Sequence, residues 1–314
     1  CYICYAKGLA REAVLHGERA LARAEHVGDA RLVAQVRAAL GQALATAGGY
    51  DRALLLLDVA IDAKRRNVPR SGSVPVGSAY ALACKGSILG DRGAFALAHE
   101  CLAEALQLAS EGTHHVRCSV LGWICTVYQW QGRWQEALAA GQEATRIAAH
   151  VKSSHMFAIS QALAGYADWM LTRRPQALAA IQDAAAWTEA RGGRLFTSLI
   201  YGWLVDALVA QGNTAAARHR GAQAIVRGRE GERIGEAMAR RALALAALQA
   251  DDRPAVERHL RAADRSAALR GSAHEAAVTT LLRARIAAER GLRHDARAAL
   301  DGCVGVLTAG DGRS

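Results

Sequence analysis

Small residues recur along the chain with a period of about 40 residues. Eight turn positions mark this period, mostly with glycine or aspartate, which suit tight turns: Gly8, Gly48, Asp91, Gly132, Thr172, Gly212, Asp251 and Gly291. Alanine stands five residues after the turn in seven of the eight units, and again twelve residues after it. These two positions are two helical turns apart, so they share one helix face, where alanine lets a neighbouring helix approach closely.

The same pattern predicts two helices in each unit, one before the turn and one after it. Seven residues before the turn a small residue recurs in part, as at Gly41, Cys84, Cys125 and Gly165. We therefore interpret Cys84 and Cys125 as packing residues. The chain is expected to be an all-α solenoid of antiparallel helix pairs, with about fifteen helices that bury their faces only against neighbours.

One solenoid is predicted over residues 1–314, although the length alone suggests about two domains. Its units are a truncated repeat over 1–29 and repeats over approximately 30–72, 73–112, 113–153, 154–193, 194–231, 232–271 and 272–314. Residues 1–7 are expected to end a helix whose first two turns are missing. Tyr2, Ile3 and Tyr5 would then form an exposed apolar patch.

Glycine, aspartate and proline mark the connections. The glycines that follow second helices suit left-handed C-caps: Gly28, Gly72, Gly112, Gly193, Gly231 and Gly271. Asp29 and the pair Asp251–Asp252 suit N-caps. Pro175 and Pro254 fall near helix starts, where a missing N–H is harmless. The longest spacing contains Pro69–Pro75 and predicts a widened loop.

Composition agrees with a helical protein whose core is aliphatic. Apolar residues make up 52% of the chain, aromatic residues only 5%, and there are 4 prolines. So little proline argues against an all-β chain with many turns. A charged fraction of 22% and a mean hydropathy of +0.03 argue against disorder. The longest apolar stretch, Ser198–Ala210, is too short to span a bilayer and contains Asp206, so no membrane partner is expected.

The net charge of +10 does not by itself indicate a nucleic-acid site. Basic residues occur singly or in pairs, such as Arg173–Arg174, without a run of five like charges. We interpret them as solvated helix faces, with a nucleic-acid surface as the alternative. The seven cysteines are odd in number and irregularly spaced, which favours a reducing cytoplasm over a disulfide framework. Cys1 and Cys4 form a CxxC that lacks the second pair of a zinc ribbon.

The repeat resembles the tetratricopeptide repeat (TPR). The small residues at that family's positions eight, twenty and twenty-seven match the positions seven before, five after and twelve after each turn here. Tyr128–Ala137 resembles the family's turn between its helices. The unit departs from the family in length, about 40 residues instead of ~34. The resemblance implies a right-handed superhelical solenoid whose concave groove is lined by the first helix of each pair.

Longer units of this kind resemble the C-terminal repeat regions of two groups of large bacterial signalling proteins. One group is the AAA-ATPase-coupled adenylate or guanylate cyclases, which Gly235–Ala244 and Arg270–Glu275 resemble more. The other is the ATP-dependent LuxR-type transcriptional regulators. Our leading hypothesis is a protein-interaction and regulatory region of a nucleotide cyclase with an AAA-type ATPase module. The alternative is the effector-sensing region of a LuxR-type regulator.

No catalytic motif is found in the sequence. It contains no GxxxxGK[ST] phosphate loop, no GxGxxG opening a helix after a strand, no HExxH and no GxSxG. His114–His115 would need metal-binding partners from elsewhere in the fold, so we interpret the pair as surface or capping residues. We expect the chain to be no enzyme and to hold no cofactor or metal, with any catalytic domain outside it.

The resemblance also implies a partner-binding groove. The family's groove positions lie 13, 10, 6, 3 and 2 residues before each turn. Carried over to the middle units, they give the candidate set Lys85, Thr126, Gln129, Trp130, Tyr166, Trp169, Met170, Asp206, Arg241 and Arg285. The aromatic members and Met170 would anchor a protein or peptide; the alternative is that these rings pack in the core. The paired Lys and Asn of chaperone-tail receptors are missing. Other domains of the parent chain are the second expected kind of partner.

Overall fold

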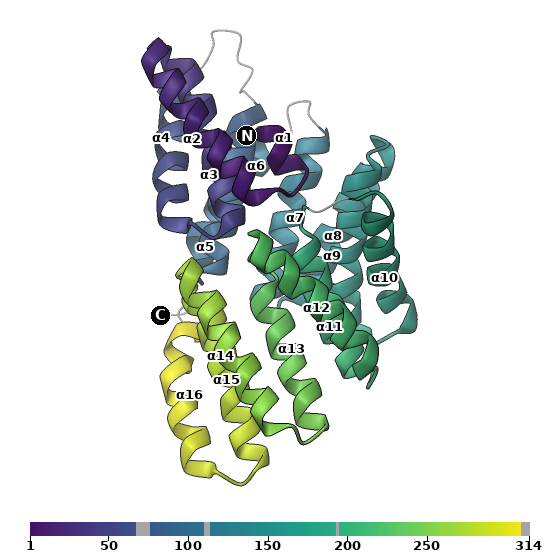
Figure 1. Ribbon diagram of the computed structural model, residues 1–314. Helices are drawn as coiled ribbons and strands as arrows, with labels where there is room; N and C mark the ends of the chain where they lie inside the picture. The colour runs from purple at the N-terminus through teal and green to yellow at the C-terminus, as the bar shows by residue number, and fades with distance from the viewer. Residues whose placement is uncertain (67–75, 110–113, 193–194, 309–314) are drawn as a thin grey trace.

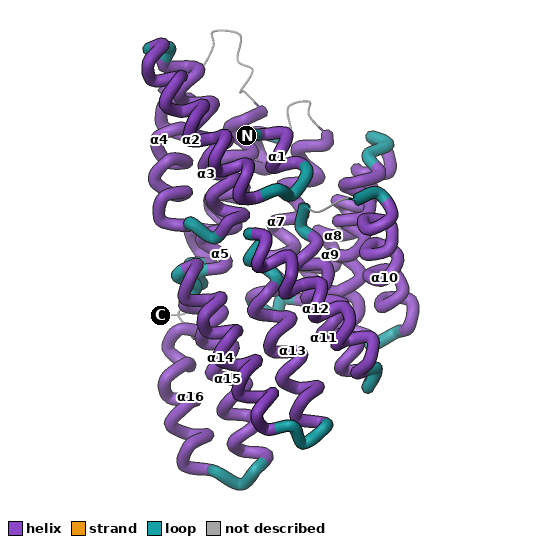
Figure 2. The backbone as a smooth tube through the Cα atoms, viewed as in Figure 1, coloured by secondary structure: helices purple, strands orange, loops and turns teal. Residues whose placement is uncertain are grey.

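The computed structural model describes residues 1–66, 76–109, 114–192 and 195–308, and every regular element in these ranges is an α-helix (Figures 1 and 2). Their bounds are α1 (Tyr2–Ala6), α2 (Ala10–Val27), α3 (Ala30–Ala47), α4 (Tyr50–Arg66), α5 (Val76–Asp91), α6 (Phe95–Leu108), α7 (His114–Trp130), α8 (Trp134–His150), α9 (Ser154–Thr172), α10 (Pro175–Ala190), α11 (Thr197–Ala210), α12 (Thr214–Glu230), α13 (Glu236–Gln249), α14 (Arg253–Arg270), α15 (Ala273–Glu289) and α16 (Arg293–Thr308). The predicted all-helical, TPR-like solenoid is confirmed.

The turns inside the helix pairs are made by residues in the left-handed region of backbone space. Gly48 has φ +83°, and its N–H returns to the carbonyls of Leu44 and Ala45. Gly132 and Gly212 adopt similar values, +71° and +77°. Only glycine enters this region without a steric penalty, which explains why glycine dominates the turn position.

The turn position is shifted in two units. The left-handed residue after α5 is Gly93, with φ +88°, and not Asp91, and the one after α9 is Arg173, with φ +55°, and not Thr172. In the first of these units the small-residue positions move by the same two residues, so that Ala98 and Ala105 are fully buried while Ala96 and Ala103 are exposed. Asp91 is the last residue of α5 and therefore precedes the turn.

In all units except the one with Gly93 the alanine positions are buried almost without exception. Ala20, twelve residues after the first turn, is partly exposed. The remaining members are all buried: Ala13, Ala53, Ala60, Ala137, Ala144, Ala177, Ala184, Ala217, Ala224, Val256, Ala263, Ala296 and Cys303. A methyl group or another small side chain at these contacts keeps the helices close.

The predicted caps are confirmed where the structure describes them. Gly28, Gly231 and Gly271 are left-handed C-caps. The Asp29 carboxylate accepts hydrogen bonds from two backbone N–H groups of α3, and Asp252 accepts one from Ala255. Pro175 and Pro254 lie in the first turns of α10 and α14. The expected loop at Pro69–Pro75 and the glycines Gly72, Gly112 and Gly193 lie outside the described residues.

The odd-numbered helices pack against one another along the solenoid, as α5 does with α7, α7 with α9, and α11 with α13. The α11 helix lies deepest, with almost every side chain buried, including Ser198, Trp203 and Val205. The apolar stretch that the sequence shows at this place is therefore a central core helix. Figure 1 shows the chain winding round so that the end of α14 and the start of α15 meet the end of α5.

Polar contacts join the two ends of the solenoid where they meet. The Arg270 guanidinium, at the end of α14, pairs with the Asp91 carboxylate at 2.7 Å, although 179 residues separate them. Both side chains are excluded from solvent, with exposed fractions of 0% and 1%. Tyr50 donates to the same carboxylate at 2.6 Å, and Ser272 donates to the backbone carbonyl of Asp91. Asp91 is thus the centre of a buried cluster.

Three further contacts extend this junction. The Arg227 guanidinium donates to the Gly8 carbonyl at 3.0 Å. The Arg233 N–H donates to the Thr46 carbonyl at 3.4 Å, and the Arg233 carbonyl accepts from Arg270 at 2.8 Å. We call these contacts and the Asp91 cluster the inter-turn seam. The seam holds the connection between α12 and α13 against the first turns of the chain.

Candidate functional site: a central pocket

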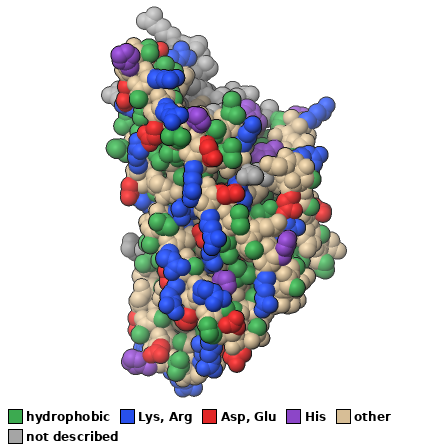
Figure 3. All heavy atoms as spheres, viewed as in Figure 1, with side chains coloured by type: hydrophobic (Ala, Val, Ile, Leu, Met, Phe, Trp, Pro, Cys, Tyr) green, Lys and Arg blue, Asp and Glu red, His purple; other side chains and the backbone are tan. Residues whose placement is uncertain are grey.

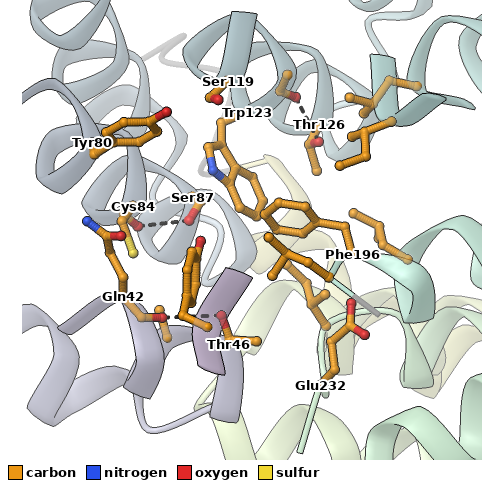
Figure 4. Close-up of a pocket in the computed structure, with 18 of the residues that line it drawn as sticks. Gln42, Thr46, Tyr80, Cys84, Ser87, Ser119, Trp123, Thr126, Phe196 and Glu232 are labelled. Carbon is orange, nitrogen blue, oxygen red and sulfur yellow. Dashed lines mark hydrogen bonds between the residues drawn. The ribbon is translucent and has the colours of Figure 1, made fainter. Parts of the chain in front are cut away.

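A pocket of about 230 Å³ lies at the centre of the molecule (Figure 4). Its walls come from the first helices of six successive pairs, α1, α3, α5, α7, α9 and α11, together with Tyr50 at the start of α4. Glu232 and Ile234, from the connection between α12 and α13, complete it. We call this cavity the central pocket. It lies on the inner side of the solenoid, where the TPR resemblance places a groove.

Aromatic side chains concentrate in the central pocket. The chain has 6 Trp, 7 Tyr and 3 Phe, and six of these residues line the pocket: Tyr5, Tyr50, Tyr80, Trp123, Phe196 and Trp203. The Trp123 and Phe196 rings meet edge to face at 5.2 Å between centroids, and Figure 4 shows them side by side. In a core made mainly of alanine and leucine, this concentration distinguishes the pocket from the rest of the interior.

The hydroxyl groups in the wall are bonded to the protein itself. Ser87 donates to the Cys84 carbonyl at 2.8 Å, Thr46 to the Gln42 carbonyl at 3.2 Å and Thr126 to the Gly122 carbonyl at 2.9 Å. Each bond satisfies the hydroxyl proton within its own helix. These residues therefore present to the cavity a surface that is mostly apolar, with oxygen lone pairs as acceptors.

The titratable groups of the wall carry little charge near neutral pH. Burial raises the pKa of the Cys84 thiol to about 12, so the sulfur stays protonated and is a poor nucleophile. Burial lowers the pKa of His155, which keeps its ring neutral. Cys84 thus has the packing role that the sequence indicates.

Glu232 is the acidic residue of the pocket wall. Its carboxylate accepts hydrogen bonds from the Thr197 hydroxyl at 3.1 Å, the Ser198 N–H at 3.3 Å and the Arg227 guanidinium at 3.2 Å. Burial raises the pKa of Glu232 to about 7, and the nearby Arg227 charge partly opposes this rise. Arg227 also contacts Gly8, so one side chain connects the pocket carboxylate to the inter-turn seam.

Of the candidate set from the sequence, Thr126 lines the central pocket. Tyr166 and Trp169 are core residues, with exposed fractions of 4% and 2%. Trp130 is partly buried, and its ring packs close to Gly90. These three rings therefore do not form an open aromatic wall. Tyr166 and Trp169 pack in the core, which is the alternative given for them in the sequence analysis.

The polar members of the set are engaged with other parts of the protein. Lys85 pairs with Asp58, Arg241 with Glu275, and Arg285, which is exposed, with Glu289. Gln129 donates to the Leu163 carbonyl at 2.9 Å. The Asp206 carboxylate accepts a hydrogen bond from the Tyr166 hydroxyl at 2.9 Å. Met170 is partly buried and packs against the main core. The structure does not bring these residues together into one site.

Trp123 and Trp203 were missing from the candidate set because the transferred groove pattern has no position nine residues before the turn. Trp123, Leu163 and Trp203 all lie nine residues before their turns, and all three line the pocket. The transferred pattern used the position ten before the turn. Ser119, Ile159 and Leu199, thirteen before the turn, also line the pocket, so a search for aromatics on that helix face would have found Trp123 and Trp203.

Tyr5 differs from its expected role, since it lines the pocket and does not face an empty side. Ile3 is 70% exposed, as predicted. Among the described residues, no group of three or more His, Cys, Asp or Glu side chains could hold a metal ion, and no helix is both long and apolar enough to cross a bilayer. On the face shown in Figure 3, Lys and Arg side chains are spread along the molecule with acidic side chains between them.

Neither a protein-family model nor a curated protein matches the chain. Many solved structures are similar to it, including the following three. A Rap protein complexed with Competence and Sporulation Factor has a TM-score of 0.63 and 13% identity, over 88% of this chain and 76% of that one. Aspartyl phosphate phosphatase F from Bacillus subtilis has a TM-score of 0.60 and 12% identity, over 89% of this chain and 72% of that one. The apo form of RapI has a TM-score of 0.57 and 12% identity, over 95% of this chain and 84% of that one. At such identities the likeness shows the fold, an all-helical TPR-like solenoid.

Proposed function

We propose that this chain is a regulatory binding module that takes an apolar side chain of a peptide or protein partner into the central pocket and performs no catalysis itself. The observation that carries the proposal is the convergence of six first helices on one aromatic-lined cavity. Concave pockets with apolar walls and few polar groups are the usual form of ligand sites. In repeat solenoids the inner face is the usual binding surface.

The structural neighbours support binding as the activity. One of them was solved as a complex with Competence and Sporulation Factor. Another is called an aspartyl phosphate phosphatase, so the non-catalytic part of the proposal has its own test, an assay of this chain against an acyl-phosphate substrate. The absence of turnover is expected.

The parent protein is a finer proposal. A nucleotide cyclase with an AAA-type ATPase module remains our leading hypothesis, and a LuxR-type regulator the alternative, with a cytoplasmic location in both. The gene sequence on either side of this chain distinguishes them. A cyclase parent requires upstream catalytic and ATPase segments, whereas a LuxR-type parent requires a helix-turn-helix domain downstream.

Selection from a random peptide library tests the binding function. Peptides retained by the chain should share an apolar or aromatic residue at one position. Trp123→Ala removes a pocket wall and should weaken binding of a selected peptide by about 2 kcal/mol, roughly 30-fold. Trp134→Ala is the matched control, because Trp134 is also partly buried but lies on α8, outside the pocket. Equal losses in both variants would contradict the proposal.

A further inference from the structure

The walls of the central pocket contain no Lys or Arg among the described residues, although the chain has 39 of them. The groups that face the cavity are aromatic rings, aliphatic side chains, hydroxyl groups, the Gln42 amide, the neutral His155 ring, a thioether, a thiol and the Glu232 carboxyl group. An anionic group placed there would lose its hydration and find no cation to replace it. Burial of an unpaired charge is strongly unfavourable.

Two arginines that contact the pocket wall or its partners, Arg227 and Arg270, are engaged with other groups of the protein. Arg227 donates to Glu232, to Thr197 and to the Gly8 carbonyl, and it also pairs with Glu230. Arg270 is paired with Asp91, and Asp91 also accepts from the hydroxyl of the pocket residue Tyr50. These guanidinium groups thus neutralise carboxylates and offer no free donor to a ligand. Two carboxylates remain close to the pocket, one in its wall and one behind Tyr50.

Building on the proposed function, we infer that the central pocket accepts an apolar group without negative charge and rejects anionic ligands, with Glu232 as the residue that sets this selectivity. The excluded classes are nucleotides, phosphorylated side chains and peptide C-terminal carboxylates. The accepted class is an aromatic or branched aliphatic group, for which Trp123 and Phe196 provide an apolar surface. Glu232 and Glu230 share the single Arg227 guanidinium, so these three side chains keep a net charge of −1 when both carboxyl groups are ionised, and that charge opposes an anion in the pocket.

Two fluorescent dyes that differ by one charged group test this inference. N-phenyl-1-naphthylamine is uncharged, and 8-anilinonaphthalene-1-sulfonate has the same ring system with a sulfonate. The neutral dye should bind the intact chain at least tenfold more tightly, and Trp123→Ala should abolish this binding. The overall charge of +10 would favour the sulfonate, so a preference for the neutral dye would have to come from the pocket itself.

At pH 8 Glu232 is mostly ionised, because its pKa is about 7, and Glu232→Gln then removes the charge and keeps the shape of the side chain. It should tighten binding of the sulfonate dye by fivefold or more and change the neutral dye by less than twofold. Glu236→Gln is the control, because Glu236 is a partly buried carboxylate that pairs with Arg240 outside the pocket. It should leave both affinities unchanged.

The outcomes separate the two proposals. Failure of both dyes to bind at a site sensitive to Trp123→Ala would overturn the pocket function itself. Equal affinity for both dyes at that site would keep the pocket function and overturn the charge selectivity. An unchanged sulfonate affinity in a folded Glu232→Gln variant would overturn the role of Glu232. The comparison on the unsubstituted chain needs no variant to fold, so it decides the selectivity in any case.

Discussion

The size of single side chains determines how closely the helices of this protein pack. Ala137 and Ala144 are fully buried at equivalent places of one helix. Interiors of this density have no room for added methylene groups. The alanine content of the chain therefore follows from helix spacing as well as from helix propensity.

Ala137→Leu should destabilise the protein by about 1–3 kcal/mol, because the larger side chain overpacks the contact between α8 and its neighbours. Arg218 is exposed, and Arg218→Ala should change stability by less than about 0.5 kcal/mol. Thermal melts of both variants measure the difference. Similar shifts in melting temperature would show that the small-residue position carries no packing constraint.

Glu232 should make the stability of the protein depend on pH. Its pKa is raised to about 7 in the folded chain, mainly by burial, against about 4.3 for a free glutamate. The folded state therefore binds the proton more tightly, so the contribution to stability is complete below about pH 4.3 and is lost as pH rises through 7. Glu232→Gln removes this dependence.

Chemical denaturation of the original chain and of Glu232→Gln at pH 5 and pH 8 measures this contribution. Relative to the original chain, the variant should gain about 1–3 kcal/mol between the two pH values. The pKa of about 7 already includes the interaction of Glu232 with Arg227. If the difference in unfolding free energy between the two proteins is the same at pH 5 and pH 8, the expectation is wrong.

At the scale of helices, most of the fold could be predicted from the sequence. Turn glycines such as Gly48 and Gly212 require left-handed backbone, and this requirement is visible as a 40-residue period. The period alone did not separate Asp91 from Gly93, because both are turn residues and Ala96 and Ala98 are the same amino acid, although glycine is the better left-handed residue. Only packing distinguishes the two alanines.

The candidate site was less predictable, for a physical reason. The positions 13, 9, 6 and 2 residues before the turn share one helix face, and the transferred pattern lacked position nine but included position three. Trp169, three residues before its turn, lies in the core, whereas Trp203, nine before its turn, lines the pocket. Glu232 comes from a connection, and no helical period indicates such a residue.

Trp169 and Trp123 should respond to truncation in opposite ways. Trp169→Ala should reduce stability by about 3–5 kcal/mol, because the ring is 2% exposed within the main core. Trp123→Ala should reduce stability less, since the ring borders a cavity, but should abolish binding of the neutral dye. Denaturant melts and dye titrations on both variants give the comparison. Binding lost only in Trp169→Ala would place the site elsewhere.

At the scale of the whole molecule, the inter-turn seam makes the pocket. Tyr5 and Tyr50 come from the first two helix pairs, and Glu232 and Ile234 from a connection nearly 200 residues later. A solenoid stabilised only by neighbouring repeats would not hold these walls together. The seam contacts Arg270–Asp91 and Arg227–Gly8 provide that link, so pocket shape and seam integrity should be coupled.

Arg270→Met tests this coupling. It leaves the Asp91 carboxylate buried with only the Tyr50 and Ser272 hydroxyls as donors, and breaking a buried pair in this way destabilises a protein by about 3–5 kcal/mol. Arg285→Met is the control, because Arg285 is an exposed member of a local pair and should lose less than about 1 kcal/mol. Adding Asp91→Asn to Arg270→Met removes the stranded charge and should recover part of the loss.

Dye binding measured well below the melting temperature shows whether the Arg270–Asp91 pair shapes the pocket or only adds stability. Arg270→Met should keep its helical circular dichroism, since the neighbour contacts of the helix pairs are intact, yet bind N-phenyl-1-naphthylamine more weakly. Small-angle X-ray scattering should show a larger radius of gyration, because the two ends of the solenoid are free to separate. Unchanged dye affinity and dimensions in a helical Arg270→Met variant would mean that the pocket walls are held by repeat packing alone.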